Sequence, residues 1–161
     1  MMAGKQPKRK PRPGVDKYGR SPLHNALVPL FEAVDIQAIA RMIKEGADPN
    51  AQDDNGFSPL HFAAQESLPE AARLLLDAGA DPNIKNAFGN TPLFRAGNTE
   101  RGIQLIKMLL DASADPFVPN HYGVSAADGV FDTTAENPTV AKCIREAAEL
   151  YREVQRRQMP S

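Results

Sequence analysis

The chain of 161 residues contains no tryptophan and a single cysteine, Cys143. One thiol cannot close an internal disulfide and has no second thiol for a zinc site, which fits a reducing compartment. Long apolar runs are also missing, whereas a membrane helix needs about 20 apolar residues. Residues 1–20 lack the apolar core of a signal peptide. We therefore expect a soluble, cytoplasmic protein with no membrane segment.

Charge is unevenly distributed along a chain whose formal net charge is -1. Residues 1–20 hold seven Lys or Arg and one acid, Asp16, which gives +6, so the remaining residues carry -7. Segments rich in proline and in charges of one sign do not fold alone. We predict a disordered basic arm over residues 1–14, an acidic folded body over 15–158 and a short tail over 159–161.

One pattern returns along the chain at a nearly constant interval. Its first part is a glycine followed closely by Ser or Thr, Pro and Leu, with copies at Gly19, Gly56 and Gly89 and a worn copy at Gly123. The intervals between these glycines are 37, 33 and 34 residues. A second part, Gly-Ala-Asp-Pro-Asn, stands at 46–50 and 79–83 and returns as Ser-Ala-Asp-Pro-Phe at 113–117. Periods of this length are typical of solenoid proteins.

Each part of the pattern has a structural role. The Ser or Thr can cap a helix, and the Pro after it fits the first helical position, where no N–H donor is needed. Apolar residues recur three and four apart over 70–76 and 103–110, which predicts a second helix with one buried face in each unit. Ser67 and Glu70 have capping-box spacing and would start one of these helices. The glycine of the second part would end them in the left-handed conformation.

These residues resemble the ankyrin repeat, a unit of about 33 residues made of a loop, a helix, a turn and a second helix, with a Thr-Pro-Leu-His signature. The resemblance implies an all-α solenoid with projecting turns or short hairpins. Its units would cover about residues 16–52, 53–85, 86–119 and 120–158, the last being a worn repeat followed by a capping helix over Pro138–Gln158. The first unit has four extra residues within 28–35, which predicts a longer turn there or an extended first helix bent at Pro29.

Stacked repeats bury their leucines between neighbours and leave the turn tips and the first-helix faces as the surface for a partner. We therefore expect a monomeric, non-enzymatic scaffold that binds another protein and needs no cofactor. An aromatic residue stands in or beside each turn, namely Tyr18, Phe57, Phe88 and Tyr122. These could form a row of interface anchors. The alternative is that they pack against neighbouring turns.

The predicted partner-binding residues lie on the turns and near the ends of the first helices, where they would line a concave face. They are Lys17, Tyr18, Arg20, Asp54, Asn55, Phe57, Phe62, Gln65, Glu66, Phe88, Asn90, Arg95, Asn98, His121 and Tyr122. The acidic body favours a basic partner. Stand-alone ankyrin proteins of this size resemble bacterial immunity proteins, which cover a cognate toxin, so one version of the function is neutralisation of a basic toxin.

Other chemistries have simpler explanations in this sequence. The resemblance implies that His24 and His61 are structural and hydrogen-bond to neighbouring backbone, and no pair of histidines has zinc-site spacing. The repeated Ser and Thr residues are caps rather than nucleophiles, and Cys143 fits the core of the last helix. We expect no catalytic or metal site. The alternative function is a regulatory adaptor, or a nucleic-acid-associated protein that uses the basic residues of 5–12.

Overall fold

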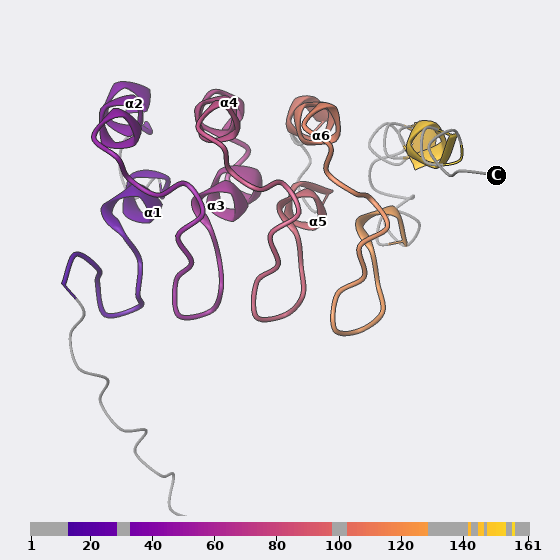
Figure 1. The fold of residues 1–161 in the computed structure, drawn as a ribbon, viewed down its shortest axis with the longest axis horizontal. Coiled ribbons are helices and arrows are strands. Elements are labelled where there is room, and N and C mark those ends of the chain that lie inside the picture. The colour runs from indigo at the N-terminus through magenta and orange to yellow at the C-terminus, as the bar shows by residue number, and fades with distance from the viewer. Residues whose placement is uncertain are drawn as a thin grey trace, which may run out of the picture.

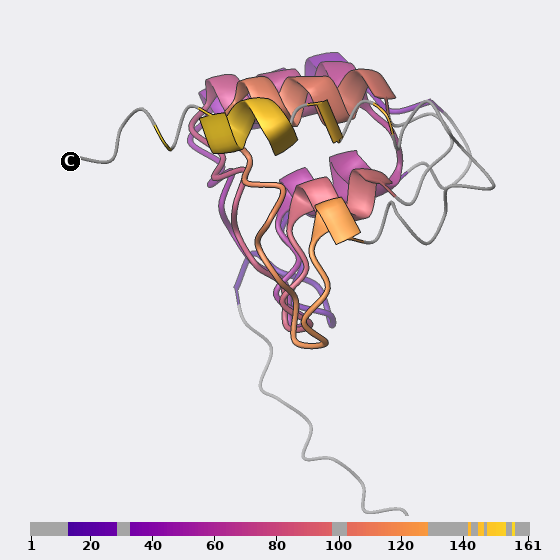
Figure 2. The same ribbon diagram turned by 90° about the vertical axis from the view of Figure 1, so that its right-hand side faces the viewer.

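The computed structural model describes residues 13–28, 33–97 and 103–128, together with residues 142, 145, 146, 148–153 and 156. Helices stack in two layers, with a projecting turn before each helix pair (Figure 1, Figure 2). The layer beside the turns, here called the inner layer, holds α1 (Pro22–Ala26), α3 (Pro59–Gln65) and α5 (Pro92–Gly97). The outer layer holds α2 (Ile36–Lys44), α4 (Pro69–Asp77) and α6 (Ile103–Asp111). No strand occurs among the described residues, and the predicted all-α solenoid is confirmed.

Each inner helix begins after a Ser or Thr, as predicted. The Ser21 side chain accepts from the backbone N–H of His24, and the Ser21 N–H donates to the His24 imidazole at 3.1 Å. Ser58 and His61 repeat this arrangement at the start of α3. Thr91 caps α5 with its hydroxyl alone, accepting from the N–H three residues later at 3.3 Å. These caps satisfy helix donors that would otherwise lack partners and fix each helix against its own turn.

The outer helices end in residues with positive φ. Gly46 and Gly79 have φ values of 92° and 88°, which confirms their predicted role as left-handed caps. Ser113 occupies the same position after α6 with a φ of 67°. A residue with a Cβ is strained by about 1 kcal/mol in the left-handed region, so Ser113 makes this turn less stable than a glycine would.

The predicted capping box of Ser67 and Glu70 is wrong. Ser67 has a φ of 54°, and the residue that precedes α4 is Leu68, whose side chain makes no capping hydrogen bond. The N–H groups of Ser67 and Leu68 donate back to carbonyls of α3, at 3.3 and 2.9 Å. Ser67 therefore ends α3 instead of starting α4, because only three residues separate the two helices and the chain must reverse within them.

The extra residues of the first repeat lie between its two helices. α1 ends at Ala26 and α2 begins only at Ile36, which corresponds to the longer turn rather than to an extended first helix. Residues 29–32 within it lie outside the described part. Asp35 then starts α2, since its Oδ1 accepts from the Ala38 N–H at 3.0 Å.

Leucines at equivalent positions form the core between the layers. Leu23, Leu60 and Leu93 are buried in the three inner helices, where they pack against buried residues of the outer layer such as Leu75 and Leu109. Each inner helix also packs on the next one, as do the outer helices. The stacking leaves the turns and the open side of the inner helices uncovered.

Two asparagines join successive repeats on the side of the outer helices. Asn50 Oδ1 accepts from the Asp81 N–H at 2.7 Å, and its Nδ2 donates to the Gly79 carbonyl at 3.0 Å. Asn83 makes the corresponding bonds to the third repeat, with distances of 2.7 and 3.1 Å. Phe117 takes the equivalent place in the third repeat. Each asparagine thus clamps its own repeat to the next, and the series stops at residue 117.

The C-terminal segment docks where this series of asparagines stops. Its residues 148–153 are helical, and Ala148 is buried. The Tyr151 ring lies 6.3 Å from the Phe117 ring, and the Arg152 guanidinium lies 4.2 Å from it. An aromatic and cationic contact therefore replaces the asparagine bonds at the end of the stack. Cys143 and the basic arm up to residue 12 lie outside the described residues.

Candidate protein-binding surface

Each projecting turn is organised around one Asp or Asn side chain. The four are Asp16, Asp53, Asn86 and Asn120. In each, Oδ1 accepts from the N–H groups two and four residues later, at 2.8 to 3.1 Å. The glycine three residues later has a φ between 75° and 78° in all four turns. The turns therefore have one common shape, held by side-chain bonds that do not depend on a partner.

Neighbouring turn tips are joined through their backbones. Asp54 N–H donates to the Tyr18 carbonyl at 2.9 Å, Ala87 N–H to Asn55 at 2.8 Å, and His121 N–H to Phe88 at 3.0 Å. The tips approach so closely that a Cβ on Gly56 would lie 2.8 Å from the next tip, at the Ala87 nitrogen. The four tips form one bonded platform rather than four separate loops.

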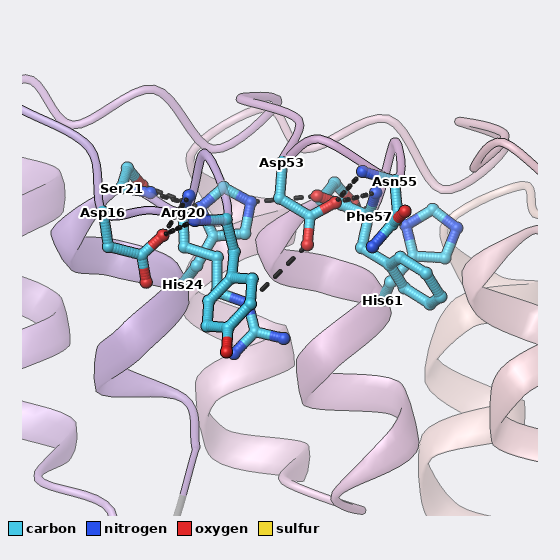
Figure 3. Close-up of polar contacts among 10 residues, drawn as sticks. Asp16, Arg20, Ser21, His24, Asp53, Asn55, Phe57 and His61 are labelled. Atoms are coloured by element: carbon cyan, nitrogen blue, oxygen red, sulfur yellow. Dashed lines mark hydrogen bonds and ion pairs between the residues drawn. The ribbon is translucent and has the colours of Figure 1, made fainter. Parts of the chain in front are cut away.

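Two buried histidines connect the inner helices to the following turns, and Figure 3 shows the first of these connections, from His24. Nε2 of His24 lies 3.0 Å from the Phe57 carbonyl, and Nε2 of His61 lies 2.9 Å from the Asn90 carbonyl. Since Nδ1 accepts from a serine N–H, Nε2 must carry the proton that is donated to the carbonyl. Burial lowers the pKa of His24 and lowers that of His61 to about 4. The structural role predicted for these neutral histidines is confirmed.

A further pair of side chains meets at the base of the first and last junctions between turns. Asp53 Oδ2 lies 3.7 Å from Nε of Arg20 in the preceding repeat (Figure 3). At the last junction, Asn120 Nδ2 donates to Asn90 Oδ1 at 2.9 Å. The middle junction places Phe57 where the others have Arg20 and Asn90. Successive repeats thus present a cation, an aromatic ring and an amide at one equivalent position.

Six side chains at and beneath the open side of the inner layer make a continuous set of contacts, which we call the aromatic–arginine cluster. Its members are Tyr18, Arg20, Phe57, Phe62, Phe88 and Arg95. The Arg20 guanidinium lies 5.3 Å from the Tyr18 ring and 4.9 Å from the Phe62 ring. The Phe57 ring lies 5.9 Å from Phe62, 6.5 Å from Phe88 and 5.7 Å from the Arg95 guanidinium. The cluster reaches from the first repeat to the third, so it forms one surface across three repeats.

Comparison with known proteins identifies the architecture. A family model described as ankyrin repeats, in three copies, matches residues 30–120. The chain belongs to the ankyrin repeat family. Its repeats fill the matched range, and the turn of the first repeat, with Tyr18 and Arg20, lies before it. The ankyrin fold predicted from the repeated motifs is therefore established.

Ankyrin relatives share only part of their length with this chain. The potassium channel KOR1 of Oryza sativa subsp. japonica is 40% identical over 74 residues, which are 44% of this chain and 9% of the channel. The transient receptor potential cation channel subfamily A member 1 of Homo sapiens is 35% identical over 63 residues, or 39% of this chain and 5% of that protein. Protein phosphatase 1 regulatory subunit 27 of Mus musculus is 35% identical over 55 residues, which are 32% of this chain and 36% of that protein.

The predicted row of aromatic residues divides into two groups. Tyr18, Phe88 and Tyr122 directly precede their turn glycines and are 49%, 47% and 81% exposed. Phe57 follows its glycine instead, so it lies at the base of the turn, half-buried, with its ring against Phe62 and Phe88. Packing, the alternative weighed for all four, therefore describes Phe57, while the other three side chains extend from the ankyrin tips.

One predicted position needs correction. We expected Phe62 on the open concave face, but it is only 8% exposed because it packs edge-on against His24 and lies under the Arg20 guanidinium. Asn98 lies outside the described residues. The remaining predicted residues lie on the tips or the open side of the inner layer. Exposed are Lys17, Asp54, Asn55, Gln65 and His121, and half-buried are Arg20, Glu66, Asn90 and Arg95.

Sequence reasoning missed how the arginines are held. Arg95 Nη2 donates to Gln65 Oε1 across the boundary between the second and third ankyrin repeats. For Arg20 the sequence holds one signal: Arg20, Phe57 and Asn90 each follow a turn glycine, so they occupy equivalent places in successive repeats. Over the described ranges, no helix is long and apolar enough to cross a membrane, and no group of three or more His, Cys, Asp or Glu could hold a metal ion.

Proposed function

We propose that this ankyrin protein is a non-enzymatic scaffold that binds a protein partner through its turn tips and the open face of its inner helices. Ankyrin repeats are protein-interaction modules, so binding of a protein follows from the family. The observation that supports the location is the platform of bonded tips that carries Tyr18, Phe88 and Tyr122 exposed. Rigid aromatic side chains bury much area at little cost in conformational entropy, which makes them good interface anchors.

The roles of the reactive side chains support a function without catalysis. Both ring nitrogens of His24 and of His61 are engaged in bonds that hold the repeats together. The serines beside them, Ser21 and Ser58, cap helices. To act as a nucleophile and a base, these histidine–serine pairs would have to break the hydrogen bonds that hold the helices and turns together.

Two versions of the binding function differ in the partner. The acidic body, which carries -7 outside residues 1–20, favours a basic partner such as a toxin that the chain would neutralise as an immunity protein. A regulatory adaptor is the second version, favoured by the similarity to a protein named as a phosphatase regulatory subunit. We further propose that the chain acts as a monomer in the cytoplasm, in keeping with its single cysteine.

The direct test is capture of a partner by the full chain and by matched variants. Tyr18, Phe88 and Tyr122 are changed together to Ala, and Leu150→Ala serves as control because Leu150 is a large apolar residue, 63% exposed, on the C-terminal helix. We expect the triple variant to bind the captured protein at least about 100-fold more weakly, with a melting temperature close to that of the original chain. The control should bind normally. Equal binding by the triple variant would rule out the tips as the interface.

The same captured partner separates the two versions. A basic partner whose activity is lost on binding supports the immunity protein. A partner that keeps its activity, or that is a subunit of a larger enzyme, supports the adaptor.

A further inference from the structure

Arg95 differs from the other arginine of the aromatic–arginine cluster. Arg20 has a carboxylate beside it, that of Asp53 at 3.7 Å. Arg95 is half-buried against the Phe57 ring, and its one hydrogen-bond acceptor among the described residues is the neutral amide of Gln65. The Nε atoms of both arginines are buried and have no hydrogen-bond partner in that part of the chain, but only that of Arg20 has a carboxylate near it. Among the described residues no carboxylate pairs with the Arg95 guanidinium, and a half-buried cation in such surroundings is costly.

The surroundings of Arg95 restrict what can complete the site. The Phe57 ring covers one face of the guanidinium, with 5.7 Å from the ring centroid to Cζ, so a ligand would approach its edge or its other face. A guanidinium edge pairs best with a planar carboxylate through two parallel hydrogen bonds. Beside it, the Phe88 ring is half exposed and contacts Phe57, so an apolar side chain next to the carboxylate would find a surface to cover.

The acidic residues of the body lie on both layers. Glu70, Asp77 and Asp111 are exposed on α4 and α6, which form the outer layer. The turns and the open side of the inner layer carry Lys17, Arg20 and Arg95. They also carry the acids Asp16, Asp54 and Glu66, and Asp53, which pairs with Arg20. The net charge of the body therefore does not describe the charge that a ligand meets at Arg95 itself.

We propose that the aromatic–arginine cluster binds an extended acidic segment of the partner, in which a carboxylate pairs with Arg95 and a neighbouring apolar side chain covers Phe88. The proposal rests on the proposed function and names the chemistry of the segment that is recognised. It differs from the expectation drawn from net charge, because a basic segment at this place would lie against the guanidinium of Arg95. The partner as a whole can still be basic elsewhere.

The test begins with a display library of random 12-residue peptides selected on the full chain. We expect the selected sequences to share an Asp or Glu next to an apolar residue. A synthetic copy of the strongest peptide is then titrated against Arg95→Gln, with Lys107→Gln as the matched control because Lys107 is an exposed cation on α6. Arg95→Gln should weaken binding about 10- to 100-fold, and the control less than twofold. Raising the salt concentration should weaken binding by the original chain.

A charge exchange guards against misfolding of the variant. Arg95→Glu should bind the original peptide poorly and bind a peptide whose acid is replaced by Lys better than the original chain does, which a merely unfolded variant cannot do. Selected peptides without acids, no selected peptide at all, or unchanged binding by Arg95→Gln would overturn the inference. In any of these three outcomes, loss of the captured partner by the Tyr18, Phe88 and Tyr122 variant would still support the proposed function. If that variant binds the partner normally, the proposed function and the inference about Arg95 both fail.

Discussion

The first two junctions between repeats are closed by buried imidazoles, whereas the third is closed without one. His24 and His61 each reach the backbone of the next turn, and Phe94 occupies their place in the third repeat. There, Asn120 bonds to Asn90 and Lys85 Nζ donates to the Pro119 carbonyl at 3.0 Å. The same stacking geometry is thus held by two chemistries, and only one of them can take up a proton. Stability should therefore respond differently to mutation and to pH in the two regions.

The largest effect is expected when a histidine bridge is removed. His61→Ala deletes a fully buried ring, its bond to Asn90 and the partner of the Ser58 N–H. We expect the free energy of unfolding in urea to fall by about 4 kcal/mol, from the cavity and the unpaired buried groups together. His121→Ala, on an exposed tip of the third junction, should change it by less than about 0.5 kcal/mol. Similar losses in both variants would contradict the structural role of the bridge.

Lowering the pH should loosen the first two junctions and spare the third. The pKa of His61 is about 4 in the folded chain and 6.5 in its reference state, so between these values the unfolded chain binds a proton that the folded chain excludes. Stability is therefore fully present above about pH 6.5 and is lost as the pH falls toward 4, by about 3 kcal/mol from His61. His24, whose pKa is also lowered by burial, adds to the loss.

The pH effect is measured by urea unfolding at several pH values. His61→Phe, which copies the residue of the third junction, should have a clearly flatter profile between pH 4 and 6.5. If the free energy of unfolding of His61→Phe falls with pH as steeply as that of the original chain, other groups are responsible for the pH dependence.

The turn glycines offer a smaller contrast between junctions. Gly56 faces the next tip, whereas a Cβ on Gly123 would meet nothing within 4 Å, although both have φ near 75°. Gly123→Ala should cost about 1 kcal/mol from backbone strain, and Gly56→Ala about 2 to 3 kcal/mol because the tips must also move apart. Thermal unfolding of the two variants compares them directly. Equal losses would show that the tips are not held as closely as the bonds between them require.

The smallest effect should come from restoring the usual residue in the third repeat. Ser113 holds a φ of 67° where the first two repeats have Gly46 and Gly79. Ser113→Gly should raise the free energy of unfolding by about 0.5 to 1 kcal/mol, since glycine adopts this conformation without the Cβ strain. Gly79→Ser is the reciprocal variant and should lower it by a similar amount. A loss of stability in Ser113→Gly would contradict this account.

Most of the fold could be predicted from the sequence because each repeat carries the same local signals. The serine caps, the positive φ of Gly46 and Gly79 and the structural histidines all depend on residues close in sequence or one period apart. Ser67 was misassigned because a serine can end one helix or start the next, and only the length of the turn decides between them. The site was harder: the burial of Phe62 and the pairing of Arg95 with Gln65 depend on how side chains from different repeats meet.

Phe117 has a consequence for the length of the array. An asparagine at this place would offer its amide to the backbone of a following repeat, as Asn50 and Asn83 do. A phenylalanine cannot, and its ring is instead covered by Tyr151 and Arg152. The C-terminal helix is therefore held to the stack by contacts with a ring, which, unlike the asparagine bonds, do not involve the backbone of a turn that follows the helix. A further repeat added by design after the C-terminal helix would need an asparagine at residue 117 to bind the turn that would then follow that helix.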